Sequence, residues 1–213
     1  MTELWHATGV SLYCSVIATA LCAVIGIPSG CLLAMVEFRG KRIILDIFNT
    51  LLSLPTVVVG LLVYLLLCRR SFLGPLGLLF TPSAIIIGEF MLALPLMIVF
   101  THSAVAAIDP AARETAKVLG AGWRTTAQML VSEARFGIMA AVAAVFGRLV
   151  GEVGIAMMLG GNIAGYTRTM TTTIALEASK GEVALGLKLG GMLMLIAVAV
   201  NVIIRRMQGG NRP

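Results

Sequence analysis

The stretch LWHATGVSLYCSVIATALCAVIGIPSGCLLAMV, residues 4–36, decides the fold class of this 213-residue chain. It contains no Asp, Glu, Lys or Arg, and a helix of about 20 apolar residues is enough to cross the hydrocarbon core of a bilayer. A cleaved signal peptide begins with positive charge and has a shorter apolar core, whereas the first basic residue here is Arg39. We therefore expect a retained membrane-spanning helix.

The rest of the chain has the same apolar character. Hydrophobic residues make up 59% of it and charged residues only 12%, against about 25% charged residues in soluble domains. Backbone polar groups in lipid must be paired within their own segment, so each apolar block is expected to be helical. The blocks cover residues 10–36, 43–67, 83–107, 136–159 and 185–204. We predict an all-α membrane protein with about five transmembrane helices, in a single domain over residues 1–213.

The basic residues predict the orientation, because Lys and Arg are enriched in cytoplasmic loops. With the polar loop 109–135 inside, ten of the 16 basic residues lie inside and five outside, while Arg148 lies within the membrane. The inside set is Arg39, Lys41, Arg42, Arg113, Lys117, Arg124, Arg135, Arg205, Arg206 and Arg212, and the outside set is Arg69, Arg70, Arg168, Lys180 and Lys188. The N-terminus is therefore expected outside and the C-terminus inside.

Proline, glycine and one acidic residue interrupt the apolar blocks. Pro55 predicts a kink near the middle of the second helix. The Gly/Pro-rich residues 71–82 predict a re-entrant or interfacial loop. Glu89 lies about two turns inside the outer end of the third helix, where we expect its carboxylate to reach interfacial water.

The loop 109–135 carries clear helix signals. Asp109 suits a helix N-cap, Pro110 suits the first helical position, and Gly120 suits the helix end. A second short helix is expected over residues 123–130. Such a helix outside the bilayer can lie on the membrane surface or dock into a groove of a partner, and spacing alone does not choose between them.

Within this loop, Glu114-Thr-Ala116 followed by Gly120 resembles the EAA signature of permease subunits of ABC importers. The resemblance implies that residues 109–135 form a coupling loop that sits in a cleft of an ATPase subunit, with Glu114, Ala116 and Gly120 in the signature positions. The sequence departs from the signature at Thr115, in a shorter stretch after Gly120, and at Ser132 in place of the closing proline.

Two charged residues lie inside the fourth apolar block. Arg148 and Glu152 are four residues apart and so share one face of a helix. Ionisable groups at bilayer depth usually mark a pathway or a partner. The pair is therefore either a structural ion pair, or Arg148 supplies positive potential to an anion path while Glu152 holds its orientation.

The Gly/Thr-rich residues 160–173 are the most unusual stretch of the chain, with five threonines. Hydroxyl and amide groups can bind a tetrahedral oxyanion without neutralising its charge. The candidate substrate contacts here are Asn162, Thr169, Thr171 and Thr172. The alternative is a flexible outer loop that contacts a partner protein.

Several segments together resemble tungstate-type ABC permeases. They are Ser53–Tyr64, Leu79–Ser83, Gly147–Gly154, Met157–Ile163, Thr167–Thr172 and Ala175–Glu182. The resemblance implies the MetI-like architecture of type I ABC importers and a homodimer in the cytoplasmic membrane. It also implies an ATPase subunit that binds ATP and Mg, and an external binding protein that delivers tungstate for import by alternating access. Molybdate, sulfate and vanadate remain alternatives.

Other functional classes find less support. The chain has no phosphate-binding motif of the G-x-x-x-x-G-K-S/T kind, and His6 and His102 are its only histidines. The four cysteines lack metal-ligand spacing and suit small core positions in helices, so no catalytic or metal site is expected. The net charge of +6 reflects basic loops, not nucleic-acid binding. An ion-coupled secondary transporter is the runner-up, although no internal repeat is visible.

Overall fold

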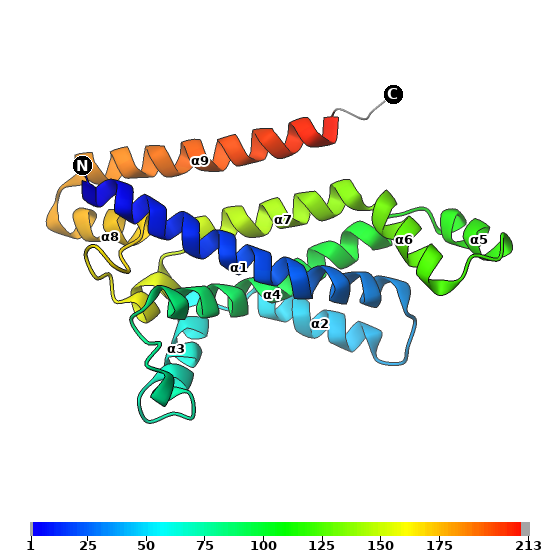
Figure 1. The fold of residues 1–213 in the computed structure, drawn as a ribbon, viewed down its shortest axis with the longest axis horizontal. Coiled ribbons are helices and arrows are strands. Elements are labelled where there is room, and N and C mark those ends of the chain that lie inside the picture. Colours follow the sequence, from blue (N-terminus) through cyan, green and yellow to red (C-terminus); the bar gives the residue numbers. More distant parts are fainter. Residues whose placement is uncertain (1, 210–213) are drawn as a thin grey trace.

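The computed structural model describes residues 2–209, which form helices joined by loops (Figure 1). Arg212, counted above in the inside set, lies outside the described residues, as do the side chains of Arg113, Lys117 and Arg205. The elements are α1 (Thr2–Met35), α2 (Lys41–Leu52), α3 (Thr56–Leu67), η1 (Gly74–Leu76), α4 (Pro82–Ala106), α5 (Pro110–Val118), α6 (Trp123–Glu133), α7 (Arg135–Val150), η2 (Ala156–Gly160), α8 (Met170–Lys180) and α9 (Val183–Gly209).

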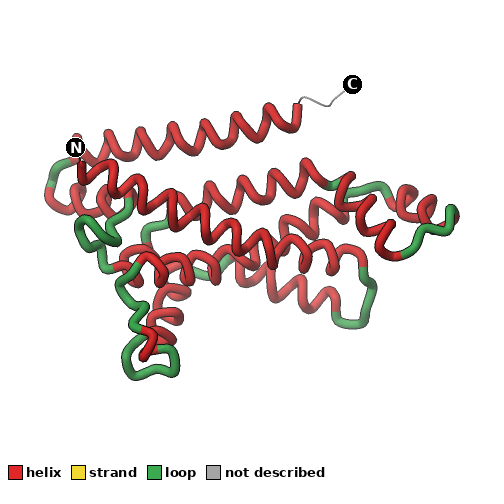
Figure 2. Tube along the Cα trace, in the orientation of Figure 1, coloured by secondary structure: helices red, strands yellow, loops and turns green. Residues whose placement is uncertain are grey.

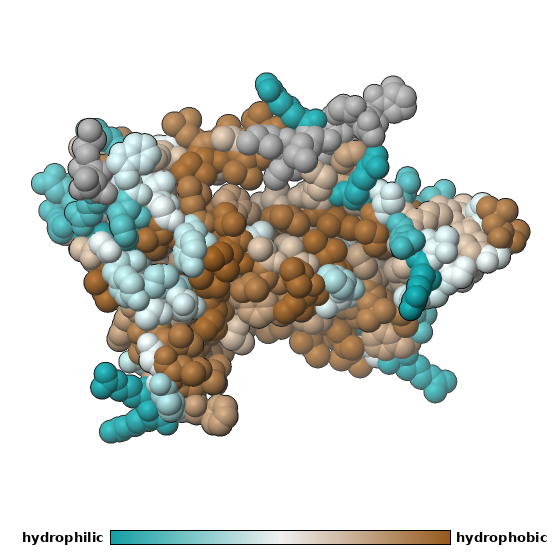
Figure 3. All heavy atoms as spheres, in the orientation of Figure 1, coloured by the Kyte–Doolittle hydropathy of each residue, from teal (hydrophilic) through white to brown (hydrophobic). Residues whose placement is uncertain are grey.

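The long helices have the length and composition of membrane spans. Within the described residues three qualify alone, over Glu3–Met35, Pro82–Ala106 and Val183–Val200, and the bent pairs α2–α3 and α6–α7 raise the number to as many as five. Most loops lie toward the two ends of the bundle (Figure 2). Apolar side chains cover the middle of the face shown in Figure 3, and polar side chains gather toward the helix ends. The predicted all-α membrane fold is confirmed.

The helices α1 and α4 form the centre of the bundle and run parallel. The Cys14 thiol donates to the Pro82 carbonyl at 3.8 Å and the Cys22 thiol to the Phe90 carbonyl at 3.6 Å, and the two partners are 68 residues apart in both pairs. Every fourth residue of this face of α1 is small, which lets the two backbones approach closely. The face consists of Cys14, Ala18, Cys22, Gly26, Gly30 and Ala34. A Cβ atom on Gly30 would lie 2.6 Å from the Ile98 carbonyl oxygen, so only glycine fits there.

The second apolar block bends much more sharply than predicted. Instead of one helix kinked at Pro55, the chain ends α2 at Leu52 and restarts as α3 at Thr56, with 98° between the two axes. Pro55 has no N–H to continue the helix, and its ring disfavours helical backbone at Leu54. It instead takes the extended N-cap position of α3, with φ −60° and ψ 131°. The result is two short helices in place of one kinked span.

The fourth apolar block also differs from the prediction. α7 ends at Val150, and the chain continues through residues 151–155 into the π-helical turn η2. Its neighbour α8 begins at Met170, so the last threonines of the Gly/Thr-rich stretch belong to a helix and not to the loop. The loop 68–81 turns once at η1 and packs on η2, where the Phe80 N–H donates to the Leu159 carbonyl at 2.8 Å.

Candidate functional site

The helix signals of the loop 109–135 are confirmed in α5 and α6. The Asp109 carboxylate accepts the backbone N–H of Ala111 at 2.9 Å, which caps α5. Gly120 has a φ of 75° and ends α5, and the N–H of Ala121 donates back to the Ala116 carbonyl at 2.9 Å. A left-handed residue with this bond closes a helix C-terminus, and a side chain at this φ would strain the backbone.

The tip of this loop presents apolar side chains that the sequence analysis did not single out. Val118 is 86% exposed, Leu119 is 80% exposed and Trp123 is 54% exposed, whereas Ala116 is buried. Glu114 and Gly120 are exposed. The available signal was the apolar pair directly before Gly120. This helical loop protrudes at one end of the bundle (Figure 1). Exposed apolar side chains clustered there suit contact with another protein.

Arg148 and Glu152 form the expected ion pair, with the Arg148 Nη1 atom 2.6 Å from the Glu152 Oε2 atom. The Glu152 side chain is only 3% exposed, while the Arg148 side chain is 41% exposed. The other oxygen of Glu152, Oε1, accepts the backbone N–H groups of Gly154 at 2.9 Å and Ile155 at 3.4 Å. Glu152 thus holds both the arginine and the chain segment that follows α7.

The threonines at the start of α8 lie next to this segment. The Thr169 Oγ1 atom accepts the Thr172 N–H at 3.2 Å, and the Thr172 Oγ1 atom accepts the Thr169 N–H at 2.9 Å. Thr171 donates its hydroxyl to the Glu152 carbonyl at 2.7 Å. All three threonines are buried, and their hydroxyls already have partners within the chain. The structure therefore brings these three residues together with Glu152 and Arg148.

Asn162 does not join that cluster. It has a left-handed backbone with φ 51°, and its Oδ1 atom accepts a hydrogen bond from the Arg168 Nε atom at 3.2 Å. Arg168 also forms an ion pair with Glu3 of α1. This arginine joins the loop before α8 to the first turn of α1. The sequence shows it only as a single basic residue in a Thr-rich stretch, so this role was not predicted.

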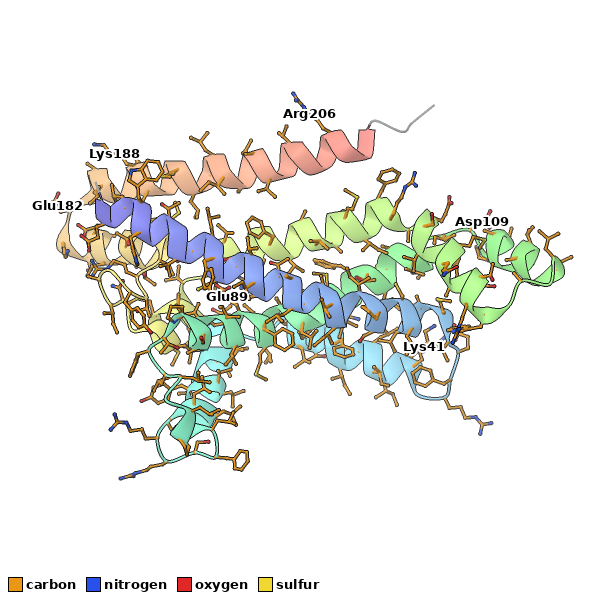
Figure 4. All side chains as sticks on the ribbon, in the orientation of Figure 1. Lys41, Glu89, Asp109, Glu182, Lys188 and Arg206 are labelled. Carbon is orange, nitrogen blue, oxygen red and sulfur yellow. The ribbon has the colours of Figure 1, made fainter. Side chains whose placement is uncertain are left out.

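The expectation that Glu89 reaches interfacial water is wrong. Its side chain lies inside the bundle (Figure 4), the residue is 3% exposed, and its Oε2 atom has no hydrogen-bond partner among the described residues. Both neighbours of Glu89 pack against other elements, because the Phe90 carbonyl accepts the Cys22 thiol of α1 and Gly88 approaches η2 closely. A Cβ atom on the neighbouring Gly88 would lie 2.6 Å from the Ile155 side chain. Position along α4 did not reveal this contact, because η2 comes from a distant part of the sequence.

The ion pair faces an open surface of this chain. Gly147 and Gly151 are exposed, and a Cβ atom on Gly147 would meet nothing within 4 Å. Among the described residues, no three His, Cys, Asp or Glu side chains are grouped so that they could hold a metal ion. The features with functional chemistry are therefore the apolar tip of α5–α6 and the half-exposed Arg148.

Known permease proteins are similar to this chain over most of its length. An anion ABC transporter permease protein from Haloferax volcanii is 39% identical over 95% of this chain and 90% of its own length. The tungstate uptake system permease protein TupB is 36% identical in Peptoclostridium acidaminophilum, over 93% of this chain and 87% of that protein. TupB from Campylobacter jejuni is 42% identical over 81% of this chain and 72% of that protein.

The fold is shared with a chain of a known ABC transporter. A structure of the MetNI methionine ABC transporter in an inward-facing conformation superposes with a TM-score of 0.82 at 19% identity, over 97% of this chain and 95% of that chain. A family model described as binding-protein-dependent transport system inner membrane component matches residues 26–210. The chain therefore belongs to the family of binding-protein-dependent transport system inner membrane components and is a transport subunit of an ABC importer.

Proposed function

We propose that this permease moves an oxyanion, tungstate in the first place, across the inner membrane by alternating access, with molybdate, sulfate and vanadate as the alternatives. The similarity to two tungstate uptake permeases at 36% and 42% identity supports this substrate class. The structural feature that carries the proposal is Arg148, a cation at bilayer depth whose side chain is 41% exposed in the single chain.

The position of Arg148 fits a path between two copies of the chain. A charged side chain at bilayer depth is costly in lipid, so its open face should meet protein or water. Glu152 engages only the Nη1 atom, which leaves the other guanidinium donors for an anion. A homodimer places two such arginines around one central path, in line with the symmetry of most oligomers.

The buried threonines have a different role in this proposal. Thr169, Thr171 and Thr172 bond to one another and to Glu152, so they hold the wall of the path and contact the anion only if that wall opens. Asn162 lies in the clamp formed with Arg168 and Glu3, near the N-terminal end of α1. That end faces an external binding protein in the proposed orientation, with the N-terminus outside and the C-terminus inside.

The opposite end of the bundle is proposed to contact the ATPase. Val118, Leu119 and Trp123 would enter an apolar cleft of the ATPase subunit, with Gly120 providing the turn between α5 and α6. ATP and Mg bind to that partner. Movement of the cleft would then be transmitted through α6 into α7, which begins directly after it at Arg135 and carries Arg148.

Uptake of labelled tungstate tests the proposal in cells that lack their own oxyanion importers. The cells carry this chain with its ATPase and binding protein, and excess molybdate, sulfate or vanadate competes. ATP-dependent uptake that these anions compete only weakly supports a tungstate importer. An intact complex without tungstate uptake would remove the substrate assignment and leave the transporter family unchanged.

A further inference from the structure

A cavity of about 760 Å³ lies at the end of the bundle that carries α5 and α6. Its walls come from the end of α1, the turn into α2, the end of α4 and the start of α5. The volume falls within the range of about 300–1,000 Å³ that is typical of ligand sites. None of the residues assigned to the transport path lines it, so it is a separate feature of the fold.

The lining of this cavity combines charges of both signs with apolar surface. Its polar residues are Glu37, Lys41, Arg42, His102 and Asp109, and its apolar residues include Phe38, Ile43, Val105 and Leu130. An inorganic anion would meet two carboxylates and a large apolar area. A ligand that joins a phosphate, an ammonium and acyl chains would find a matching surface for each part.

The first turn of α2 is the best place for the phosphate. The N-cap of α2 is Gly40 with φ 97°, and no side chain caps the N–H groups of this 12-residue helix. The Lys41 N–H donates to the Phe38 carbonyl at 3.3 Å, and the following N–H groups and the helix dipole favour an anion at this point. Lys41 already pairs with Glu37 at 2.7 Å, whereas no ion pair of Arg42 is found among the described residues. Arg42 is therefore the basic side chain that is available to pair with a phosphate.

The position along the bundle is that of lipid headgroups. The spans α1 and α4 end at Met35 and Ala106, and the charged lining residues follow directly after these ends. Lys41 and Asp109 lie at the same end of the bundle (Figure 4). We propose that the cavity binds the headgroup of a zwitterionic glycerophospholipid, with its phosphate at Arg42 and the start of α2 and its ammonium near Asp109. Its assignment to the inner leaflet rests on the proposed function.

The bound lipid would act on the coupling loop through Asp109. This residue lines the cavity and also caps α5, where its carboxylate accepts the Ala111 N–H. A headgroup at Asp109 would hold the start of α5 relative to α2 and α4. Coupling between ATP hydrolysis and transport then depends on the lipid, while assembly of the complex does not.

Native mass spectrometry of the purified permease–ATPase complex in mild detergent tests the site. The probes are dioleoylphosphatidylethanolamine, the phosphatidylglycerol with the same chains, and inorganic phosphate. Arg42→Ala removes the spare cation, and Ala106→Phe fills the cavity without changing charge. Arg70→Ala is the matched control, because Arg70 is an exposed arginine just beyond the α3 end of the bent pair α2–α3. Thermal melts confirm that each variant is folded.

The wild-type complex should retain one phosphatidylethanolamine per permease copy. Arg42→Ala should weaken this binding about tenfold, as expected for the loss of one charge-assisted hydrogen bond, and Ala106→Phe should abolish it. Arg70→Ala should bind as the wild type does. Equal retention in wild type and Ala106→Phe would overturn the proposal, as would displacement by phosphate alone or equal binding of phosphatidylglycerol. Cavity occupation by an ATPase side chain would also overturn it; this would be seen as protection of an Ala106→Cys thiol from a maleimide that requires the ATPase and no lipid. The binding readout needs no transport, so its failure is separate from failure of the proposed function.

Discussion

Replacing Glu152 by alanine should destabilise the permease through the chain segment that follows α7. The carboxylate is 3% exposed and accepts the Arg148 guanidinium and the N–H groups of Gly154 and Ile155. Each buried N–H left without a partner costs about 1–3 kcal/mol. The 3.4 Å bond of Ile155 is long, so we assign it the low end of this range. The half-exposed Arg148 side chain can turn toward water or the path. Loss of the ion pair therefore adds little to the loss in the free energy of unfolding.

The expected loss in the free energy of unfolding is therefore about 2–4 kcal/mol for Glu152→Ala. For a chain of this size, that corresponds to a fall in Tm of about 5–15 °C. Glu152→Gln keeps an acceptor oxygen for Gly154 and Ile155 and should lose about half as much or less. The measurement is thermal unfolding of the detergent-solubilised complex, followed by intrinsic fluorescence, with Arg148→Ala as the matched control.

Two results would refute this reasoning. A melting temperature of Glu152→Ala within error of wild type would mean that the carboxylate does not hold the segment after α7. Equal destabilisation by Glu152→Gln and Glu152→Ala would mean that charge, and not the acceptor geometry at Gly154 and Ile155, carries the effect.

Three further predictions concern the path, the coupling loop and the helix core. Arg148→Lys keeps the charge but loses the planar guanidinium, so uptake of labelled tungstate should fall about tenfold with normal membrane levels, and uptake equal to wild type would exclude a bidentate role. Gly120→Asp places a side chain at φ 75° and a charge beside the apolar tip, so transport and ATPase co-purification should both be lost, whereas Glu133→Gln in α6 serves as an unaffected control. Gly30→Val would place its Cβ atom 2.6 Å from the Ile98 carbonyl oxygen, so it should lower the free energy of unfolding by at least about 1–3 kcal/mol. An unchanged melting temperature would contradict the close approach of α1 and α4.

Structural features that depend only on residues close together along the chain could be predicted from the sequence. The apolar blocks predicted the long helices, because transfer of a helix into lipid depends on the composition of that segment alone. Asp109 and Gly120 predicted the ends of α5 for the same reason, since capping bonds reach only a few residues along the chain. The ion pair between Arg148 and Glu152 followed from helical spacing.

The candidate site was predicted in part. Glu152, Thr169, Thr171 and Thr172 do come together. The hydroxyls of the three threonines bond within the chain, which residue type alone did not indicate. The apolar tip at Val118 and Leu119 was not singled out, although the residues stand directly before Gly120. Which of these groups contact the substrate stays a prediction.

The sequence by itself determined the fold class, the membrane setting, the helix caps and the family resemblance, all of which rest on local composition, spacing or short motifs. Only the tertiary structure decided how far the chain turns at Pro55, where α7 ends and whether Glu89 reaches water. Each of these depends on packing between elements far apart in the sequence. Proline ends a helix locally, but the 98° turn is set by how α3 packs on α4 and η2, and Glu89 is buried where α4 packs against α1 and η2.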